Sequence, residues 1–447
     1  MAKPEFTADI RAGRLDKADI DNNFSDLHPP LSRAEALIAA DRCYFCYDAP
    51  CTTACPTGID IPGFIQKIRS DNIRGSAQTI LRENIMGGMC ARVCPTEILC
   101  EDACVRHTHE DKPVDIGLLQ RYATDPIFEN NTKLFERAQR SGRRVAVVGA
   151  GPAGLSCAHR LAMLGHDVVI YNRNSKPGGL NEYGIAAYKT VDNFAQREVD
   201  YILSIGGIEV RNNVALGADV TLAELRDQYD AVFLGIGLGA VNDLGISGAD
   251  IVGVENAIDY IAALRQAADK GTLPVARRVL VVGGGMTAID VAVQSKRLGA
   301  EQVLIAYRRG PKEMGASEFE QQLAQTNNVS ILHWMTPVAV SKQDGTISVA
   351  LARTRLGSDG RLTITDDVQT LQVDMVFKAI GQKLVDDGLQ GVALQGGRIV
   401  VDDNFATALG RVWAGGDCVV GGEDLTVSAV QHGKVAAIAI DRSLRSG

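Results

Sequence analysis

Cysteine is concentrated in one short stretch of the chain. Eight of the ten cysteines lie in two runs, Cys43-x2-Cys46-x4-Cys51-x3-Cys55 and Cys90-x3-Cys94-x4-Cys100-x3-Cys104. Cys55 and Cys94 are each followed by a proline. Thiolate sulfur is a usual ligand of structural zinc and of iron–sulfur clusters. The chemistry that these residues could perform is therefore metal binding, with electron transfer if the metal is iron.

Two kinds of metal centre compete for this pattern. Structural zinc sites usually pair two cysteine knuckles across a longer spacer. Here three cysteines fall within nine residues and a fourth precedes a proline. This arrangement is similar to the bacterial ferredoxin run, in which the cysteine before proline ligates the other cluster, although the second gap is four residues here instead of two. The pattern favours two 4Fe–4S clusters and leaves zinc as the alternative.

The ligands do not divide evenly if Cys55 crosses over. One cluster then has four thiolates, from Cys55, Cys94, Cys100 and Cys104. The other cluster has three, from Cys43, Cys46 and Cys51. On spacing alone, Cys90 is the candidate for the missing fourth ligand.

The element pattern changes after the cysteines. Residues 1–135 read as a mostly helical segment, and the polar stretch 129–144 reads as a connector. From Arg143 onward, short apolar runs lead into glycines and then into helical periodicity, which is typical of α/β structure.

The first of these runs leads into a dinucleotide-binding turn. The turn is Gly149-Ala150-Gly151-Pro152-Ala153-Gly154. Its three glycines are expected to permit the tight turn, to let the backbone approach a pyrophosphate, and to allow close helix–strand packing. The next strand ends at Asn172, where an acid would usually hold the ribose. Gly179 and Leu180 follow in a turn that resembles the GGL turn of two-dinucleotide flavoproteins.

A second dinucleotide-binding turn lies about 130 residues further along the chain. It consists of Gly283, Gly284, Gly285, Met286, Thr287 and Ala288. The strand after it ends in Arg308 and Arg309, and arginine at this place suits the 2′-phosphate of NADP. The alternative is a solvated basic strand end.

A third signature, Gly416-Asp417, lies near the end of the sequence. It resembles the Gly-Asp segment that contacts the ribityl chain of the flavin in flavoproteins with two dinucleotide-binding domains. Two segments ending at Gly237 and Gly381 look like crossover strands between two domains. The expected organisation is a helical domain over 1–135, a flavin domain over 143–268 and 384–447, and an inserted nicotinamide domain over 269–383. The fold class is α/β, with two Rossmann-like domains after the helical iron–sulfur domain.

Composition limits the partners. The chain has 447 residues, a net charge of −8 and 46% hydrophobic residues. The acidic balance argues against nucleic acid as a partner. No apolar run is long enough for a membrane helix and no apolar signal core follows the first residue, so a cytoplasmic location is expected.

These features together resemble the NAD(P)H-oxidising iron–sulfur and flavin subunits of dihydropyrimidine dehydrogenases, and also the small subunit of glutamate synthase. The resemblance implies FAD, NADP or NAD, and two 4Fe–4S clusters. It implies that Gln120, sixteen residues beyond Cys104, supplies the odd cluster ligand in place of Cys90. It also implies that Lys189 contacts the flavin. The loop of Ala379, Ile380 and Gly381 would then lie on the nicotinamide side.

The implied function is electron input. NAD(P)H would be oxidised here, and a partner subunit with FMN and its own iron–sulfur clusters would reduce uracil or thymine. No catalytic acid, base or nucleophile is predicted on this chain, because the cofactors carry the chemistry. A glutamate synthase small subunit is the first alternative. The second is a cluster-bearing scaffold or sensor whose flavin fold is a relict.

Overall fold

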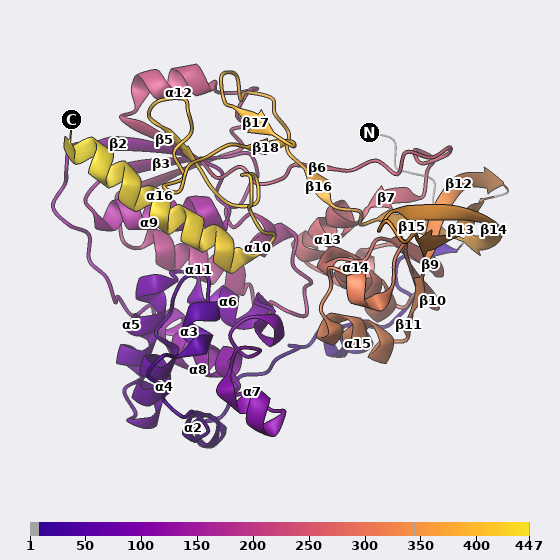
Figure 1. Ribbon diagram of the computed structural model, residues 1–447, viewed down its shortest axis with the longest axis horizontal. Helices are drawn as coiled ribbons and strands as arrows, with labels where there is room; N and C mark the ends of the chain where they lie inside the picture. Colours follow the sequence, from indigo (N-terminus) through magenta and orange to yellow (C-terminus); the bar gives the residue numbers. More distant parts are fainter. Residues whose placement is uncertain (1–8, 344, 447) are drawn as a thin grey trace. The chain divides into compact units, whose positions relative to one another are not determined.

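The structure is a computed structural model that describes residues 9–343 and 345–446. The chain forms two compact units. Unit 1 comprises the described part of Met1–Leu27, with Tyr183–Val191 and Ala240–Lys383. Unit 2 comprises His28–Glu182, Asp192–Gly239 and the described part of Leu384–Gly447. Figure 1 labels the elements of both units.

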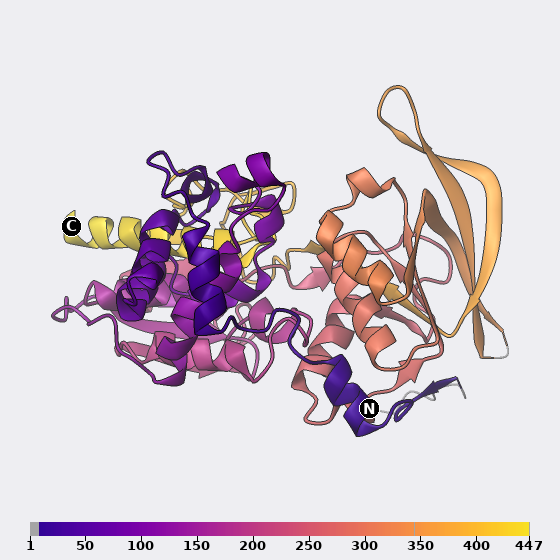
Figure 2. The same ribbon diagram turned by 90° about the horizontal axis from the view of Figure 1, so that it is seen from below.

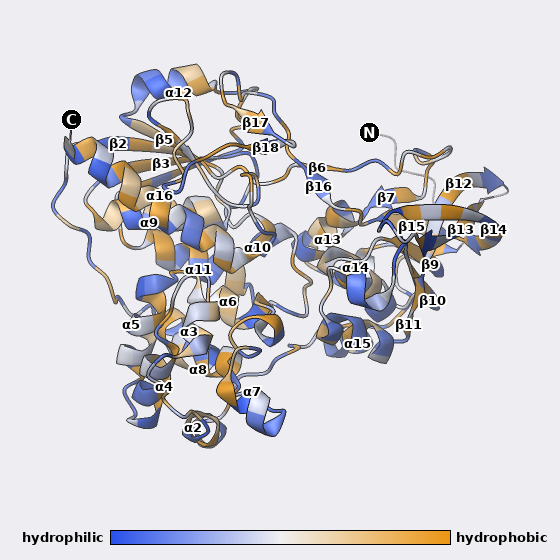
Figure 3. Ribbon diagram, in the orientation of Figure 1, coloured by the Kyte–Doolittle hydropathy of each residue, from blue (hydrophilic) through white to orange (hydrophobic). Residues whose placement is uncertain are grey.

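A five-stranded parallel sheet forms the centre of unit 2, in the order β19-β5-β2-β3-β4. Its strands are β2 (Arg144–Val148), β3 (Asp167–Asn172), β4 (Ile208–Asn212), β5 (Ala231–Leu234) and β19 (Val412–Ala414). The strand sequence RVAVV is buried at four of its five positions, as expected of a parallel strand that is covered on both faces. Figure 3 colours the central strands as hydrophobic.

Helices cover this sheet. They are α9 (Pro152–Met163), α10 (Leu180–Tyr183), α11 (Phe194–Leu203), α12 (Leu222–Gln228) and α16 (Thr426–Ser446), and a short hairpin of β17 (Leu394–Gln395) and β18 (Arg398–Ile399) accompanies them. Helix α9 starts with Pro152 at its first position, where proline lacks only a hydrogen bond that the helix does not need. Helices α9 and α16 lie side by side (Figure 1).

The cysteine-rich region of unit 2 is helical. Its elements are α2 (Arg33–Asp41), α3 (Pro50–Ala54), α4 (Ile61–Arg69), α5 (Ile73–Glu83), α6 (Gly87–Val93), η1 (Thr96–Ile98), α7 (Val105–Glu110) and α8 (Ile116–Glu129). Helix α2 starts with a capping box between Ser32 and Glu35. Helix α4 buries Ile61, Phe64 and Ile68 on one face, at the spacing of an amphipathic helix.

The helices α5, α6 and α8 share a hydrophobic core with the five-stranded sheet of unit 2. Leu81, Met89 and Phe128 belong to the same buried cluster as Val145 and Phe194. The cysteine-rich helices and the first dinucleotide turn are therefore parts of one packed body.

Unit 1 has a second five-stranded parallel sheet, in the order β11-β10-β9-β15-β7. Its strands are β7 (Val254–Asn256), β9 (Arg278–Val282), β10 (Gln302–Tyr307), β11 (Val329–His333) and β15 (Met375–Lys378). The helices are α13 (Ala257–Gln266), α14 (Met286–Arg297) and α15 (Glu318–Thr326), with the short turns η2 (Lys270–Thr272) and η3 (Pro311–Glu313).

An antiparallel sheet forms a further layer of unit 1. It consists of β12 (Met335–Gln343), β13 (Thr346–Leu356) and β14 (Leu362–Val373), and its orange ribbon extends beyond the helices in Figure 2. The N-terminal elements are β1 (Ile10–Arg11), paired with β8 (Val275–Ala276), and α1 (Lys17–Asn23).

The two crossover segments pair with each other. Strand β6 (Ala240–Val241) runs antiparallel to β16 (Gln382–Lys383), so the longest segment of unit 1, Ala240–Lys383, begins and ends in adjacent strands. The compact units also differ from the expected limits, because residues 240–268 contribute β7 and α13 to unit 1. The functional domain limits of 1–135, 143–268, 269–383 and 384–447 stay a prediction. Among the described residues, no helix is both long and apolar enough to cross a bilayer.

Candidate iron–sulfur and nucleotide sites

Four cysteines surround one pocket of unit 2. They are Cys43, Cys46, Cys51 and Cys104, and Tyr44, Ile65 and Arg106 are among the other residues that line it. The first three come from the segment between α2 and α3. Cys104 is the residue directly before α7. The backbone N–H of Phe45 donates a hydrogen bond to Sγ of Cys43 over 3.4 Å, and such bonds to ligand sulfur tune the potential of a cluster.

The remaining cysteines form a second group. Cys94 lies close enough to Cys90 to share a hydrogen bond, and Cys55 and Cys100 are its other thiol neighbours. The first turn of α8 approaches the same region, because the N–H of Gly117 donates to Glu101 over 2.9 Å. Gln120 is buried one turn further along α8, and its Nε2 donates to the carbonyl oxygen of Gly87 on α6, the helix that carries Cys90.

This grouping corrects the expected division of ligands. Cys104 was assigned to the set of Cys55 and Cys94, but it lies with Cys43, because the chain turns back ahead of α7. The first set is therefore complete with four thiols. The assignment of Gln120 as the odd cluster ligand stays a prediction.

The electrostatics of both groups fit a positively charged occupant. Burial, together with the neighbouring Cys104 and Cys43, raises the pKa of Cys51 to about 12. Burial also raises the pKa of Cys100 well above its usual value. Crowded, buried thiols become thiolates only when a cation such as iron compensates their charge. Four thiols around one pocket are also the donor set that a 4Fe–4S cluster requires. Among the described residues, no three His, Cys, Asp or Glu side chains are grouped tightly enough to hold a single metal ion.

The first glycine turn has the shape of a pyrophosphate cradle. Gly149 has a positive φ of 99°, and a methyl group on it would lie 2.2 Å from the carbonyl oxygen of Gly235. A methyl group on Gly154 would lie 1.9 Å from the carbonyl oxygen of Gly149. Gly151 lies directly before α9, and a methyl group on it would have Cα of Gly179 as its nearest neighbour, 3.8 Å away. The turn is therefore closed on its protein side and open where a phosphate would approach. The other predicted residues of this turn, Ala150 and Ala153, are buried within it.

The other predicted flavin residues lie in unit 2, with one exception. Asn172 is buried, and its Nδ2 donates to Asn174, Lys176 and Asn212. Gly179 faces Gly151, and Leu180 begins α10. The exception is Lys189, which lies in unit 1 with its Nζ 2.7 Å from Asp290 and 2.6 Å from Glu320. Although burial disfavours its charge, Asp290 and Glu320 raise the pKa of Lys189. Its assignment as a flavin contact stays a prediction.

The Gly416-Asp417 segment is held by a histidine that the sequence analysis did not single out. The N–H of Gly416 donates to Nδ1 of His432 over 3.1 Å. Burial lowers the pKa of His432, which keeps the imidazole neutral and able to accept. Burial and the nearby Asp424 raise the pKa of Asp417 to about 6. The only sequence signal for this contact is that His432 lies on the helix that follows the Gly416-Asp417 segment.

The second glycine turn repeats the first. Gly283 has a φ of 144°, and a methyl group on it would lie 2.1 Å from the carbonyl oxygen of Ala379. This contact brings the Ala379–Ile380–Gly381 loop next to the turn. A methyl group on Gly285 would meet no described atom within 4 Å, so this position is open to a ligand. Met286 and Thr287 follow as the first residues of α14, and the ring of Tyr307 covers Gly284.

Arg308 and Arg309 directly follow β10, at the carboxyl end of the second strand of this sheet. Arg308 is exposed and Arg309 half-buried. Within the described part of the chain, neither guanidinium forms an ion pair. Both remain available for an anion.

Comparison with known proteins decides the family. Residues 20–132 match the family described as dihydropyrimidine dehydrogenase domain II, 4Fe-4S cluster. Residues 143–433 match the pyridine nucleotide-disulphide oxidoreductase family. The chain is 36% identical over 425 residues to the NAD-dependent dihydropyrimidine dehydrogenase subunit PreT homolog of Salmonella typhi, covering 95% of this chain and 98% of the relative. The chain belongs to the PreT family. The PreT subunit of Escherichia coli K12 is 34% identical over 423 residues, again 95% of this chain and 98% of the relative.

Other relatives share the same plan. The small chain of glutamate synthase [NADPH] from Escherichia coli K12 is 32% identical, covering 93% of this chain and 92% of the relative. Among solved structures, Mycobacterium tuberculosis FprA in complex with NADPH has a TM-score of 0.58 at 17% identity, over 68% of this chain and 85% of FprA. Lactococcus lactis thioredoxin reductase has a TM-score of 0.54 at 21% identity, over 68% of this chain and all of the reductase chain, 100%. These two structures share the fold of the two-dinucleotide module.

Membership of the PreT family confirms the expected resemblance and the expected fold class. The protein is a flavin and iron–sulfur oxidoreductase whose cofactors are FAD, NAD(P) and 4Fe–4S clusters. The residues present fit these groups, through the thiol-lined pocket and the two open glycine turns.

Proposed function

We propose that this protein is the electron-input subunit of an NAD(P)-dependent dihydropyrimidine dehydrogenase. A partner subunit, with FMN and iron–sulfur clusters, would receive the electrons and reduce uracil or thymine to the 5,6-dihydro forms. One observation carries this proposal: the two cysteine groups and the first dinucleotide turn are parts of one packed unit. The name of the PreT relatives, which makes them subunits of dihydropyrimidine dehydrogenase, supports the same assignment.

When bound, the cofactors would supply the redox chemistry, namely hydride transfer between nicotinamide and flavin and single-electron transfer through iron–sulfur clusters. The residues of this chain bind and orient these groups. Gly149, Gly151 and Gly154 shape the flavin pyrophosphate cradle at the start of α9. The Gly416 amide is held by His432, and the half-buried Asp417 directly follows it.

The cluster ligands follow the geometry. The first cluster would take Cys43, Cys46, Cys51 and Cys104. The second would take Cys55, Cys94, Cys100 and Gln120. Cys90 would then be a buried neighbour of Cys94 and not a ligand.

Two arginines support NADPH as the preferred donor. Arg308 and Arg309 follow the strand whose end lies beside the ribose in this fold, and both are free of ion pairs with described residues. The PreT relatives are named NAD-dependent, whereas the glutamate synthase relative is named for NADPH. By binding the 2′-phosphate, the two arginines would make this chain prefer NADPH, in contrast to the PreT relatives, which are named NAD-dependent.

A glutamate synthase small subunit is the second candidate function. It is favoured by the 32% identity to that chain over 93% of this protein. The PreT relatives are more similar, at 34–36% identity. The proposed partner therefore reduces pyrimidines.

The protein purified without oxygen tests the proposal. It should contain FAD and about eight irons, as two 4Fe–4S clusters, and should pass electrons from NAD(P)H to artificial dyes. Stoichiometric zinc with little iron, or an absorbance spectrum without flavin, would contradict the proposal. The flavin-free result would revive the scaffold alternative.

A further inference from the structure

Two adjacent glycines of α6 bring this helix close to three others of unit 2, α5, α8 and α11. A methyl group on Gly88 would lie 2.5 Å from Cζ of Phe194 on α11 and 2.6 Å from Cε2 of Phe128 on α8. A methyl group on Gly87 would lie 2.6 Å from Cγ2 of Ile80. Only glycine therefore allows α6 to approach these three neighbours this closely. Helices α6 and α8 belong to the cysteine-rich region of unit 2. Helix α11 belongs to its flavin-binding half, which is the part that contains the β19-β5-β2-β3-β4 sheet and the first dinucleotide turn.

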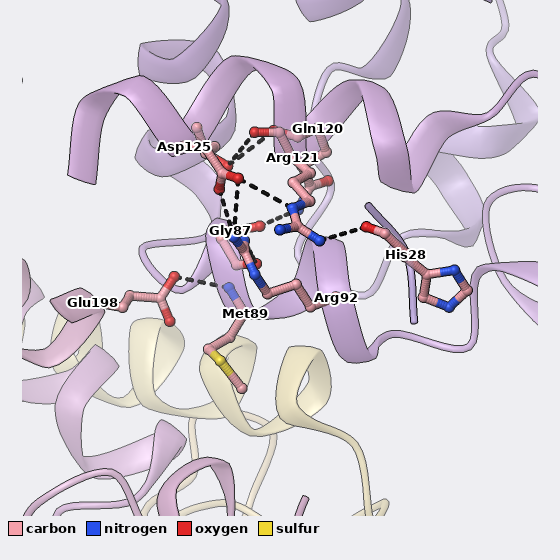
Figure 4. A network of polar contacts seen from close by, with 10 residues as sticks. His28, Gly87, Met89, Arg92, Gln120, Arg121, Asp125 and Glu198 are labelled. Carbon is pink, nitrogen blue, oxygen red and sulfur yellow. Dashed lines mark hydrogen bonds and ion pairs between the residues drawn. The ribbon is translucent and has the colours of Figure 1, made fainter. Parts of the chain in front are cut away.

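Glu198 of α11 holds the first turn of α6. Its side chain is fully buried, and Oε1 accepts the backbone N–H of Met89 over 3.0 Å (Figure 4). The N–H of Gly88 also bonds to this carboxyl group. Helix α6 has no side-chain cap of its own, because Met86 stands at its N-cap. The first amides of a helix lack internal acceptors, so a carboxyl oxygen from another helix supplies what α6 lacks.

Arg92, near the C-terminal end of α6, contacts both α11 and α8. Its guanidinium lies 3.5 Å from the centre of the Phe194 ring, and its Nη2 donates to Asp125 of α8 over 2.9 Å. Nη1 donates to the carbonyl of Gly88 over 3.0 Å. Asp125 also accepts from Nε of Arg121 over 3.1 Å (Figure 4). The position of α6 is therefore defined by α11 and α8 together.

Helix α6 in turn orients Gln120. The Nε2 of this buried side chain donates to the carbonyl oxygen of Gly87 over 2.7 Å. The bond fixes which end of the amide faces α6, and it leaves Oε1 as the atom for a ligand role. A shift of the first turn of α6 would move the Gly87 carbonyl and rotate the amide with it.

We propose that Glu198 is a positioning residue for the Gln120 ligand of the second iron–sulfur cluster. By holding the Gly88–Met89 amides, Glu198 places the Gly87 carbonyl that orients the amide of Gln120. The flavin-binding half of the unit thus sets the ligand geometry of that cluster. This inference rests on the proposed assignment of Gln120 as a ligand.

The experiment compares Glu198→Gln with Glu198→Leu in the full chain, purified anaerobically. Gln keeps a carbonyl oxygen for the Met89 amide, whereas Leu has a similar volume and no acceptor. The readouts are iron content and the Mössbauer spectrum of the oxidised protein, in which an iron with an oxygen ligand is distinguishable from all-thiolate irons. Glu198→Gln should keep about eight irons and the signal of the distinct iron. Glu198→Leu should keep the iron but shift or lose that signal.

A matched control separates positioning from stability. Val199→Ala removes buried packing from the neighbouring residue of α11 without touching the hydrogen bonds, so it should leave the spectrum unchanged. An unchanged spectrum in Glu198→Leu would overturn the inference, and so would a lost signal in Glu198→Gln. If Glu198→Leu does not fold, Glu198→Asp decides, because its shorter carboxylate retracts from Met89. A shifted signal then supports the inference and an unshifted one overturns it.

The ligand assignment is tested separately. Gln120→Ala should remove the signal of the distinct iron, and Cys90→Ser should not. If the parent protein lacks that signal, or if Cys90→Ser alone loses a cluster, the assignment of Gln120 has failed, whatever the Glu198 variants show.

Discussion

Replacing single glycines of the first dinucleotide turn should separate loss of flavin from loss of fold. The two variants are Gly151→Ala and Gly154→Ala, which lie three residues apart on the same turn. The methyl group of Gly154→Ala would lie 1.9 Å from a backbone oxygen, far inside any real contact distance. Strand β2 and helix α9 would have to separate to admit it. The expected cost is at or above the ~1–3 kcal/mol of ordinary overpacking, because a backbone atom cannot rotate away.

Gly151→Ala should behave differently. Its methyl group would lie 3.8 Å from the nearest described atom, and the backbone there has a φ of −81°, which alanine adopts freely. The expected cost in folding free energy is within about 1 kcal/mol, the range for losing a good N-cap residue. The same methyl group projects where the pyrophosphate must approach, so FAD should be lost.

The assay is thermal unfolding with and without added FAD, together with the flavin released per chain. The parent protein should gain stability from FAD by mass action, and Gly151→Ala should gain none. Gly410→Ala is the control, because its methyl group would meet no described atom within 4 Å. Stoichiometric FAD in Gly151→Ala, or parent-like stability in Gly154→Ala, would refute the reasoning.

Four further predictions follow from the other sites. Gly285→Ala should fold and retain FAD but raise the KM for NAD(P)H steeply, measured by dye reduction; an unchanged KM would refute the open position at the second turn. The double variant Arg308→Ala with Arg309→Ala should raise the KM for NADPH far more than that for NADH, since each charge-assisted phosphate contact is worth ~1.5–3 kcal/mol; equal use of both nucleotides by the parent would contradict this. Cys104→Ser should lose one cluster and leave about four irons, and retention of about eight would refute Cys104 as a cluster ligand. Burial lowers the pKa of His159 to about 3, so the unfolded chain binds a proton below pH 6.5 that the folded chain does not. Stability should fall by up to ~1.4 kcal/mol per pH unit below that value, and melting curves of His159→Leu should show a shallower fall.

The parts of the site that depend on local sequence were predictable. The turns around Gly151 and Gly285 follow directly from glycine spacing after an apolar strand, and the structure gives both the expected open positions. The two runs of cysteines, Cys43–Cys55 and Cys90–Cys104, were also visible in the sequence. Both features are local, because a turn and its helix lie within about fifteen residues.

What the sequence did not reveal depends on tertiary packing. Cys104 joins Cys43 because the chain reverses before α7, and spacing carries no record of that reversal. Lys189 pairs with Asp290 and Glu320, which are more than a hundred residues away in sequence. Glu198 was not singled out either, because the Met89 amide that it accepts lies 109 residues away in sequence. Such long-range pairings need the fold itself.

The most direct test of the central claim is anaerobic NAD(P)H oxidation driven by uracil or thymine. It is measured for this chain alone and together with a candidate FMN and iron–sulfur partner. The account predicts that the chain alone reduces dyes but no pyrimidine, and that dihydropyrimidine forms only when the partner is present. Robust pyrimidine reduction by the isolated chain would contradict the account, as would a tight complex whose only electron-dependent product is glutamate.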